Sequence, residues 1–204
     1  MAIAFGNTSG NGTQGTTTWS HNNDGNFVLV GINTTSDSIS GITYDGDAMT
    51  QIGTTLFYST IGRYFELWGI ETAKTGANDI VVSGGANQNG CATSISDYGS
   101  NSGFNSGTDT ATPAEITVTT TVDNAYVVAF GVAISYSSLT TGTTDVVGGV
   151  NGDPNLRMIR STDAVSPAGA DTIGVNMTGS ELGAYVAVGI NPVDSSFIPQ
   201  IIMT

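Results

Sequence analysis

The sequence is poor in charged residues, and those present are mostly acidic. Of its 204 residues only 10% are charged, and four Lys or Arg stand against seventeen Asp or Glu, a formal net charge of −13. Nucleic acids and anionic membranes are bound through clustered Lys and Arg. We therefore predict that the chain binds neither, although its acidity can equally serve only solubility. The nearest pair of cations, Arg157 and Arg160, should face opposite sides of a strand because they are three residues apart.

Cysteine is nearly absent, which excludes a fold held together by disulfides. Cys91 is the only cysteine, so it has no partner within the chain. It stands near the start of an apolar segment, which predicts a buried and unreactive thiol. The first residues, Met1–Asn7, lack the basic and apolar regions of a signal peptide. No window approaches the roughly 20 apolar residues of a membrane span.

Histidine is equally scarce, which limits the catalytic chemistry. His21 is the only histidine, in a segment that enters an Asn-Asn-Asp-Gly turn, so we expect a solvated loop side chain. Triads and zinc sites are normally built around a placed histidine, and no Gly-x-Ser-x-Gly elbow occurs. We predict no catalytic residue, no cofactor, no metal site and no enzymatic activity.

Carboxylates are the remaining candidates for chemistry. Glycoside hydrolysis needs two of them across a cleft, and the glutamates that could supply them are Glu66, Glu71, Glu115 and Glu181. Their spacing does not pair them, so a hydrolase stays an alternative that only a shared cleft would revive. The segments Asp45–Asp47 and Asn151–Asn155 offer oxygen ligands for calcium, but Asp-Gly and Asn-Gly favour hairpin turns.

What the sequence does contain is strand periodicity. Three nearly continuous apolar runs indicate central strands packed face to face, with glycines where backbones approach closely; they are Asn26–Ile32, Asn124–Ile134 and Gly183–Ile190. Further segments alternate with period two; they are Arg63–Ile70, Ile80–Ser83, Glu115–Thr119, Leu156–Arg160 and Asp171–Met177. No long segment keeps a helical stripe, and Glu71–Lys74 could form one helical turn at most.

These features predict an all-β fold. We expect a single domain over residues 1–204, an antiparallel β-sandwich of jelly-roll type with about eight to twelve strands. The Gly- and Ser-rich segment Ser100–Thr112 should be a long loop between its halves. The apolar C-terminal tail, residues 195–204, should form an edge strand or a docking arm.

One group of segments carries a resemblance. A Gly-Ile-Thr-Tyr-Asp-Gly-Asp-Ala-Met-Thr hairpin in Gly41–Ile52 is followed by a Glu-Leu-Trp strand in Phe65–Ile70 and by Gly76–Val82. Together they resemble the jelly-roll or β-sandwich domain of bacteriophage virion proteins, and the similarity extends from about Asn26 to Ile190. The resemblance implies capsid decoration or cement proteins, or fibre proteins, and supplies no catalytic residues.

The function we expect is therefore structural. A virion protein of this kind, assembled in the host cytoplasm, would bind the major capsid protein or other virion proteins and form a homo-oligomer, by analogy a trimer. The alternative is a lectin-like module of a tail fibre or cell-surface protein that binds a glycan. Its candidate binding residues are aromatic, namely Tyr58, Tyr64, Tyr98, Phe104 and Tyr136.

Overall fold

A computed structural model describes residues 2–36, 39–72, 74–109, 111–178 and 183–194 of the chain. These residues contain 17 β-strands and one short 3-10 helix, η1 (Val150–Gly152). The all-β antiparallel sandwich is therefore confirmed. The strands outnumber the eight to twelve expected, because the described chain forms four sheets.

The first half of the chain forms two sheets. The inner one has the order β1 (Ala4–Gly10), β9 (Asn89–Ser96), β3 (Phe27–Thr34), β7 (Arg63–Glu71), β6 (Thr50–Tyr58). The outer one has the order β2 (Thr18–Asn23), β8 (Gly76–Gly84), β4 (Ile39–Tyr44), β5 (Asp47–Ala48). An apolar core that includes Trp19, Ile42, Tyr44 and Trp68 lies between these two sheets.

The second half is built in the same way. Its inner sheet has the order β10 (Tyr98–Asp109), β17 (Gly183–Pro192), β12 (Tyr126–Ala133), β15 (Leu156–Ser161), β14 (Thr143–Val147). Its outer sheet has the order β11 (Ala114–Thr119), β16 (Ala170–Met177), β13 (Tyr136–Leu139). The core between them includes Ile116, Ile159, Val175 and Tyr185.

The two halves repeat one strand order. The strands of the two inner sheets correspond one to one. In sheet order, β1, β9, β3, β7 and β6 of the first half correspond to β10, β17, β12, β15 and β14 of the second. In the outer sheets, β2, β8 and β4 correspond in the same way to β11, β16 and β13. The contacts between halves also repeat, since β1 contacts β14 just as β10 contacts β6. The chain is therefore an internal pair of sandwiches related by an approximate two-fold arrangement.

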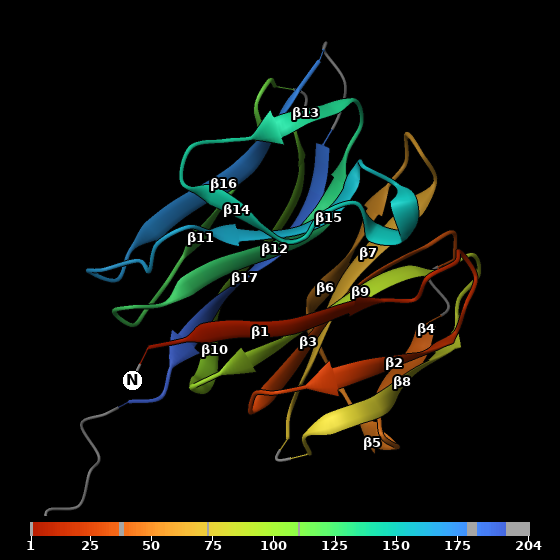
Figure 1. Ribbon diagram of the computed structural model, residues 1–204. Helices are drawn as coiled ribbons and strands as arrows, with labels where there is room; N and C mark the ends of the chain where they lie inside the picture. The colour runs from red at the N-terminus through yellow and green to blue at the C-terminus, as the bar shows by residue number, and fades with distance from the viewer. Residues whose placement is uncertain (1, 37–38, 73, 110, 179–182, 195–204) are drawn as a thin grey trace, which may run out of the picture.

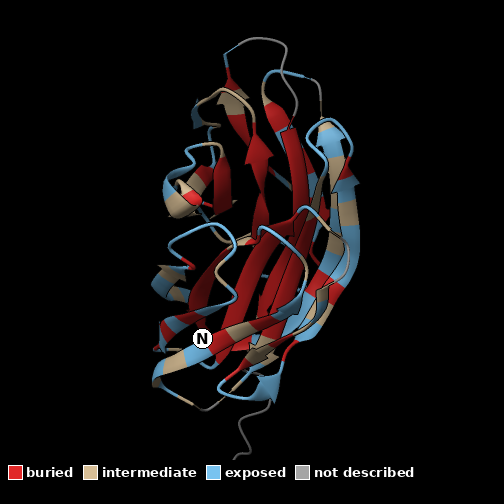
Figure 2. Ribbon diagram, turned by 90° about the vertical axis from the view of Figure 1, so that its right-hand side faces the viewer, coloured by how far each residue is buried: buried red, intermediate tan, exposed pale blue. Residues whose placement is uncertain are grey.

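The inner sheets face each other and share the largest core. It joins side chains of the first half, such as Leu29, Phe65 and Ile95, to Phe130 and Val188 of the second. The layers follow each other as outer, inner, inner and outer sheet, with the second half above the first in Figure 1. Figure 2 shows the consequence, with buried strands through the middle and exposed strand segments along the sides. The expected single-domain organisation stays a prediction.

The apolar runs and alternating segments of the sequence all form strands. The runs become β3, β12 and β17, whose described residues are almost entirely buried. β3 and β12 pack against each other across the inner sheets, whereas β17 is a neighbour of β12 in the same sheet. The segment from Glu71 contains no helix among its described residues, because Glu71 ends β7.

One prediction of a loop is wrong. Most of Ser100–Thr112 belongs to β10, a strand of 12 residues that pairs along nearly all of β17. Its Gly-, Ser- and Asn-rich sequence has a low intrinsic preference for strands, but pairing with a buried neighbour overrides that preference. Two register shifts, on either side of Ser102, bend this strand. The tail, residues 195–204, lies outside the described residues.

Candidate functional site

His21 lies inside the first half, so the prediction of a solvated loop histidine is wrong. It belongs to β2, where Trp19, His21 and Asn23 alternate toward the interior. Its Nδ1 lies 3.0 Å from the hydroxyl of Ser9, and its Nε2 lies 3.0 Å from the hydroxyl of Ser94. Trp19 donates its indole N–H to Ser9 as well. Each ring nitrogen thus has one partner, as a neutral imidazole requires.

Burial controls the protonation of this imidazole. It lowers the pKa of His21 from 6.5 to about 4, although the negative charge of nearby Asp24 acts in the opposite direction. The ring is therefore neutral at physiological pH and is held between two hydroxyls with no exposed surface. This arrangement orders the packing of β1, β2 and β9, and it gives solvent no access to the imidazole.

The lone thiol behaves as predicted. Cys91 is fully buried in β9, within the core shared by the inner sheets. Burial raises the pKa of this thiol far above its ordinary value, so it stays protonated.

The candidate glutamates are kept apart. Glu66 is buried in β7 and accepts hydrogen bonds of 2.8 Å from the hydroxyl of Thr55 and from the indole N–H of Trp68. Glu71 ends the same strand, five residues on, so its side chain points to the opposite face. Glu115 is exposed in β11 of the other half, and Glu181 lies outside the described residues. No two of the described glutamates face each other across a cleft.

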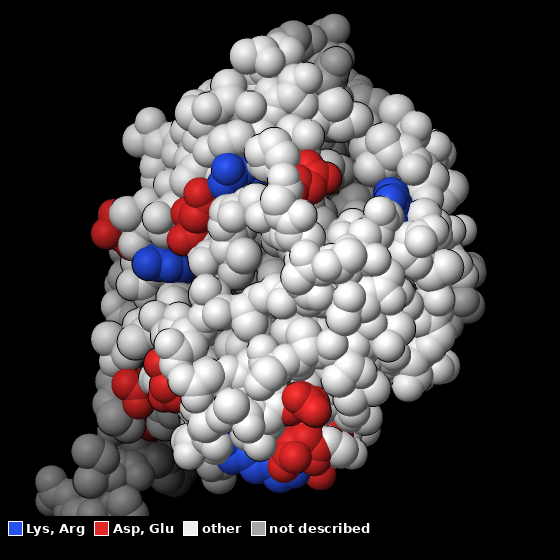
Figure 3. Space-filling view, turned by 45° about the vertical axis from the view of Figure 1, so that its right-hand side comes forward, with Lys and Arg blue, Asp and Glu red and all other residues white. Residues whose placement is uncertain are grey.

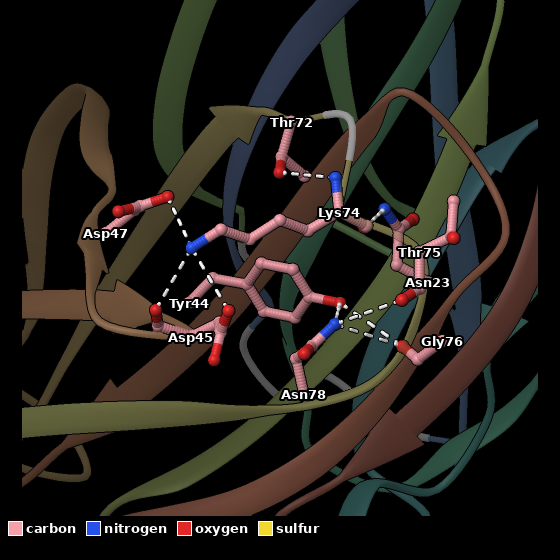
Figure 4. Close-up of polar contacts among 9 residues, drawn as sticks. All are labelled: Asn23, Tyr44, Asp45, Asp47, Thr72, Lys74, Thr75, Gly76 and Asn78. Carbon is pink, nitrogen blue, oxygen red and sulfur yellow. Dashed lines mark hydrogen bonds and ion pairs between the residues drawn. The ribbon is translucent and has the colours of Figure 1, made fainter.

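The Asp-Gly-Asp segment forms a turn, as predicted. Asp45 and Gly46 both have positive φ, 49° and 82°, which suits a two-residue hairpin turn and favours glycine at the second position. Figure 4 shows the ammonium of Lys74 between the carboxylates of Asp45 and Asp47, at 3.1 and 2.7 Å. Its hydrogen bonds, first to Asp47 and then to Asp45, raise the pKa of this ammonium. A lysine thus balances the acidic turn.

The second oxygen-rich segment also forms a turn, between the paired strands β14 and β15. It includes η1, in which Asn151 has a positive φ of 55°. The amide of Asn151 donates hydrogen bonds to the side-chain oxygens of Asn11 and Asn89 in the first half. This turn therefore links the two halves. In the part of the chain that the structure describes, no cluster of His, Cys, Asp or Glu has the composition of a metal site.

The two arginines of β15 face opposite sides, as predicted. Arg157 makes two hydrogen bonds of 2.7 Å to the carboxylate of Asp145 and lies 3.6 Å above the ring of Tyr136. Arg160 lies over the rings of Phe5 and Tyr126 instead. Both cations are engaged in the packing of the protein. On the face seen in Figure 3, charged side chains form small separate groups on a largely uncharged surface.

The aromatic candidates for glycan binding have different surroundings. Tyr58 is buried, Phe104 covers the backbone of Gly53, and Tyr136 packs under Arg157. Tyr64 stacks on Phe57, with ring centroids 4.5 Å apart. Tyr98 lines a cavity.

That cavity has a volume of about 480 Å³ and lies where β6 and β7 of one half meet β10 of the other. Its lining includes Phe27, Gln51, Ile52, Glu71, Tyr98 and Asn101. Burial, and after it the negative charge of Glu71, raise the pKa of the Tyr98 hydroxyl to about 12. This phenol is therefore a permanent hydrogen-bond donor at physiological pH.

Sequence reasoning did not identify Gln51 or Asn101 as site residues, and it considered Glu71 only for hydrolysis. No local pattern marks them, because they meet only after the two halves have packed. Phe57 was missed too, although the apolar triplet Leu56–Tyr58 just before a turn contains a signal. An alternating strand cannot bury three consecutive apolar side chains on one face, so the middle one must point outward.

Comparison of the chain with protein-family models, with curated proteins and with solved structures finds no match. In the described part of the chain, no helix has the length and hydrophobicity needed to cross a bilayer.

Proposed function

We propose that the chain is a structural protein of a virus particle, in the first place a decoration or cement protein of a bacteriophage capsid. Support comes from the segments that resemble such proteins, because they form one continuous corner of the first half. The Gly41–Ile52 segment runs from β4 through the Asp45–Gly46 turn into β6, and the Glu-Leu-Trp segment is the centre of β7. Its partners would be the major capsid protein and further copies of itself, by analogy in a trimer.

The observation that carries this proposal is a group of exposed apolar side chains at the end of a hairpin. The β6–β7 hairpin presents Phe57 with half of its surface exposed, stacked on Tyr64, and Ile61 in the turn is 37% exposed. Contiguous exposed apolar groups are found at contact surfaces, and aromatic side chains are enriched among the residues that contribute most to binding energy at interfaces. We call Phe57, Ile61 and Tyr64 the aromatic tip.

The strand order supports a jelly roll in each half, which suits such a role. In the second half the first strand pairs with the last, and the last pairs with the third. The second strand pairs with the seventh in the other sheet. Strands that cross repeatedly between two sheets in this manner form the Greek-key wrapping of a jelly roll.

Particle association tests the proposal. Purified particles from cells that produce the protein should contain it in a fixed ratio to the major capsid protein, measured by quantitative mass spectrometry. The Phe57→Ser, Tyr64→Ser variant should lose this association while keeping its melting temperature within a few degrees. Val122→Ser is the matched control, because Val122 is also an exposed apolar residue, at 40%, but belongs to another turn. Recovery of the wild type only as free protein would refute the proposal.

A second candidate is the carbohydrate-binding module. The observation that favours it is the cavity beside Tyr98, whose lining includes the exposed residues Glu71 and Asn101.

A further inference from the structure

Three asparagine side chains meet where the second half contacts the first. Asn151, in the turn between β14 and β15, donates its side-chain amide to the Oδ1 atom of Asn11 and, at 3.0 Å, to that of Asn89. Asn11 directly follows β1, and Asn89 begins β9. We call Asn11, Asn89 and Asn151 the asparagine junction.

A glycine follows each asparagine of the junction, and the sequence contains no other Asn-Gly pair. Asn-Gly is the dipeptide in which asparagine most readily loses its side-chain amide. The backbone nitrogen of the glycine attacks the Cγ atom of the asparagine, and a glycine has no Cβ atom to hinder that approach. Three pairs that are distant in the sequence therefore bring the same reactivity to one contact.

The reaction at Asn151 needs only water as a co-reactant. The nitrogen of Gly152 forms a bond to Cγ of Asn151, and the bond between Cγ and Nδ2 breaks. The amide leaves as ammonia and takes the proton of the Gly152 N–H. Water then opens the cyclic imide at either of its carbonyls, which leaves aspartate or isoaspartate. A hydrogen-bond donor is thereby replaced by a carboxylate.

Two of the three pairs are enclosed. Asn11 is 4% exposed, and its side-chain amide donates to two backbone carbonyls. Gly90, whose nitrogen would attack Asn89, is buried in β9 under the ring of Trp19. Its N–H donates to Oδ1 of Asn11 at 3.2 Å. In both pairs the packing of the first half opposes formation of the imide.

The third pair is the accessible one. Asn151 is only partly buried, and Gly152 is exposed, with open space where a Cβ atom would lie. The N–H of Gly152 is held by one hydrogen bond of 3.2 Å to the carbonyl of Gly149, within the single turn of η1. Local opening of this turn frees the attacking nitrogen and leaves every sheet intact.

From this arrangement we infer that Asn151 is a site of spontaneous deamidation, and that its modification weakens the contact between the two halves. A carboxylate at position 151 accepts hydrogen bonds but cannot donate them, and the Oδ1 atoms of Asn11 and Asn89 are acceptors as well. The contact loses two hydrogen bonds and gains a repulsion between oxygens. The inference does not depend on association with a virus particle, which the aromatic tip tests separately.

Incubation of the full chain in heavy-oxygen water at mildly alkaline pH tests the inference, with peptide mapping by mass spectrometry as the measurement. Asn151 should be converted at least tenfold faster than Asn11 or Asn89, and each product should carry one heavy oxygen. The melting temperature should fall as the converted fraction rises. Asn151→Gln keeps an amide but disfavours the cyclic imide, so this variant should keep its melting temperature during the same incubation.

Asn151→Asp reproduces the product and should lower the melting temperature by at least about 2 °C. Asn87→Asp is the matched control, because Asn87 is exposed, has a similar positive φ of 51° and lies outside the junction. It should melt like the wild type. Three results would overturn the inference: equal melting of the two Asp variants, conversion of Asn11 or Asn89 as fast as that of Asn151, or an unmodified Asn151 after a synthetic Val-Asn-Gly-Asp peptide is fully converted.

Discussion

At the scale of single residues, the buried imidazole of His21 predicts how the free energy of unfolding depends on pH. Its pKa of about 4 in the folded protein lies below the 6.5 of an exposed histidine. The unfolded chain therefore binds the proton more readily, so the contribution of His21 to stability is complete above pH 6.5 and is lost as the pH falls through 4. A shift of this size corresponds to a loss on the order of 3 kcal/mol.

The measurement is the free energy of unfolding by urea between pH 7 and pH 4. His21→Gln is the comparison, because glutamine cannot titrate, and the changing difference between the two proteins isolates the histidine from the carboxylates. We expect the wild type to lose up to about 3 kcal/mol more than the variant over this range. Parallel pH profiles would mean that the ring is not buried as described.

The residue scale also shows why His21 was misplaced. The buried face of β2 carries Trp19, His21 and Asn23, which is a strict period-two pattern. Two of these three side chains are polar, so a search for apolar alternation does not register the strand. The hydrogen-bond partners of His21, which are Ser9 and Ser94, come from other parts of the chain, as does the Lys74 carbonyl that accepts from Asn23. Composition predicts an apolar core well, but it cannot reveal polar groups that find partners only on folding.

At the scale of elements, apolar segments were predictable and polar ones were not. The runs that form β3, β12 and β17 are buried on both faces of their sheets. Their sequences are therefore almost continuously apolar, and this apolar run predicts the strand. β1 and β10 are edge strands at equivalent positions, and their exposed residues are mostly Gly, Ser, Thr and Asn. Edge strands gain their order from pairing on one side, and a sequence pattern does not contain the identity of that partner.

Hydrogen exchange tests whether β10 is a strand. Residues Phe104–Asp109 pair in unbroken register with β17, and β10 is the edge of its sheet. Alternate amides in this segment should therefore exchange slowly, while those between them exchange fast. The central strand β12 should be protected throughout, and the turn at Ser59–Gly62 should exchange fast. Uniformly fast exchange over Phe104–Asp109 would restore the interpretation as a loop.

At the scale of the whole molecule, the repeated strand order implies that the inner sheets meet near an approximate two-fold axis. Close to such an axis, equivalent positions face each other. Gly31 and Phe130 are each the fifth residue of their strands, β3 and β12, and a Cβ atom on Gly31 would overlap the Phe130 ring. Two phenyl rings could not fit here, and two glycines would leave a void. The pair shows how the two halves have become complementary to each other.

This complementarity gives the last prediction, a double-mutant cycle across the shared core. Gly31→Ala should destabilise the protein by about 1–3 kcal/mol, because the methyl group displaces a buried ring. Phe130→Ala should cost about 3–5 kcal/mol through the cavity it leaves. In that background, Gly31→Ala should become nearly neutral, which gives a coupling of at least about 0.5 kcal/mol in urea unfolding. Gly41→Ala is the control, since a Cβ atom on that strand glycine meets no other atom. Additive costs would show that the inner sheets do not pack at Gly31 and Phe130, and the approximate two-fold arrangement would lose its central contact.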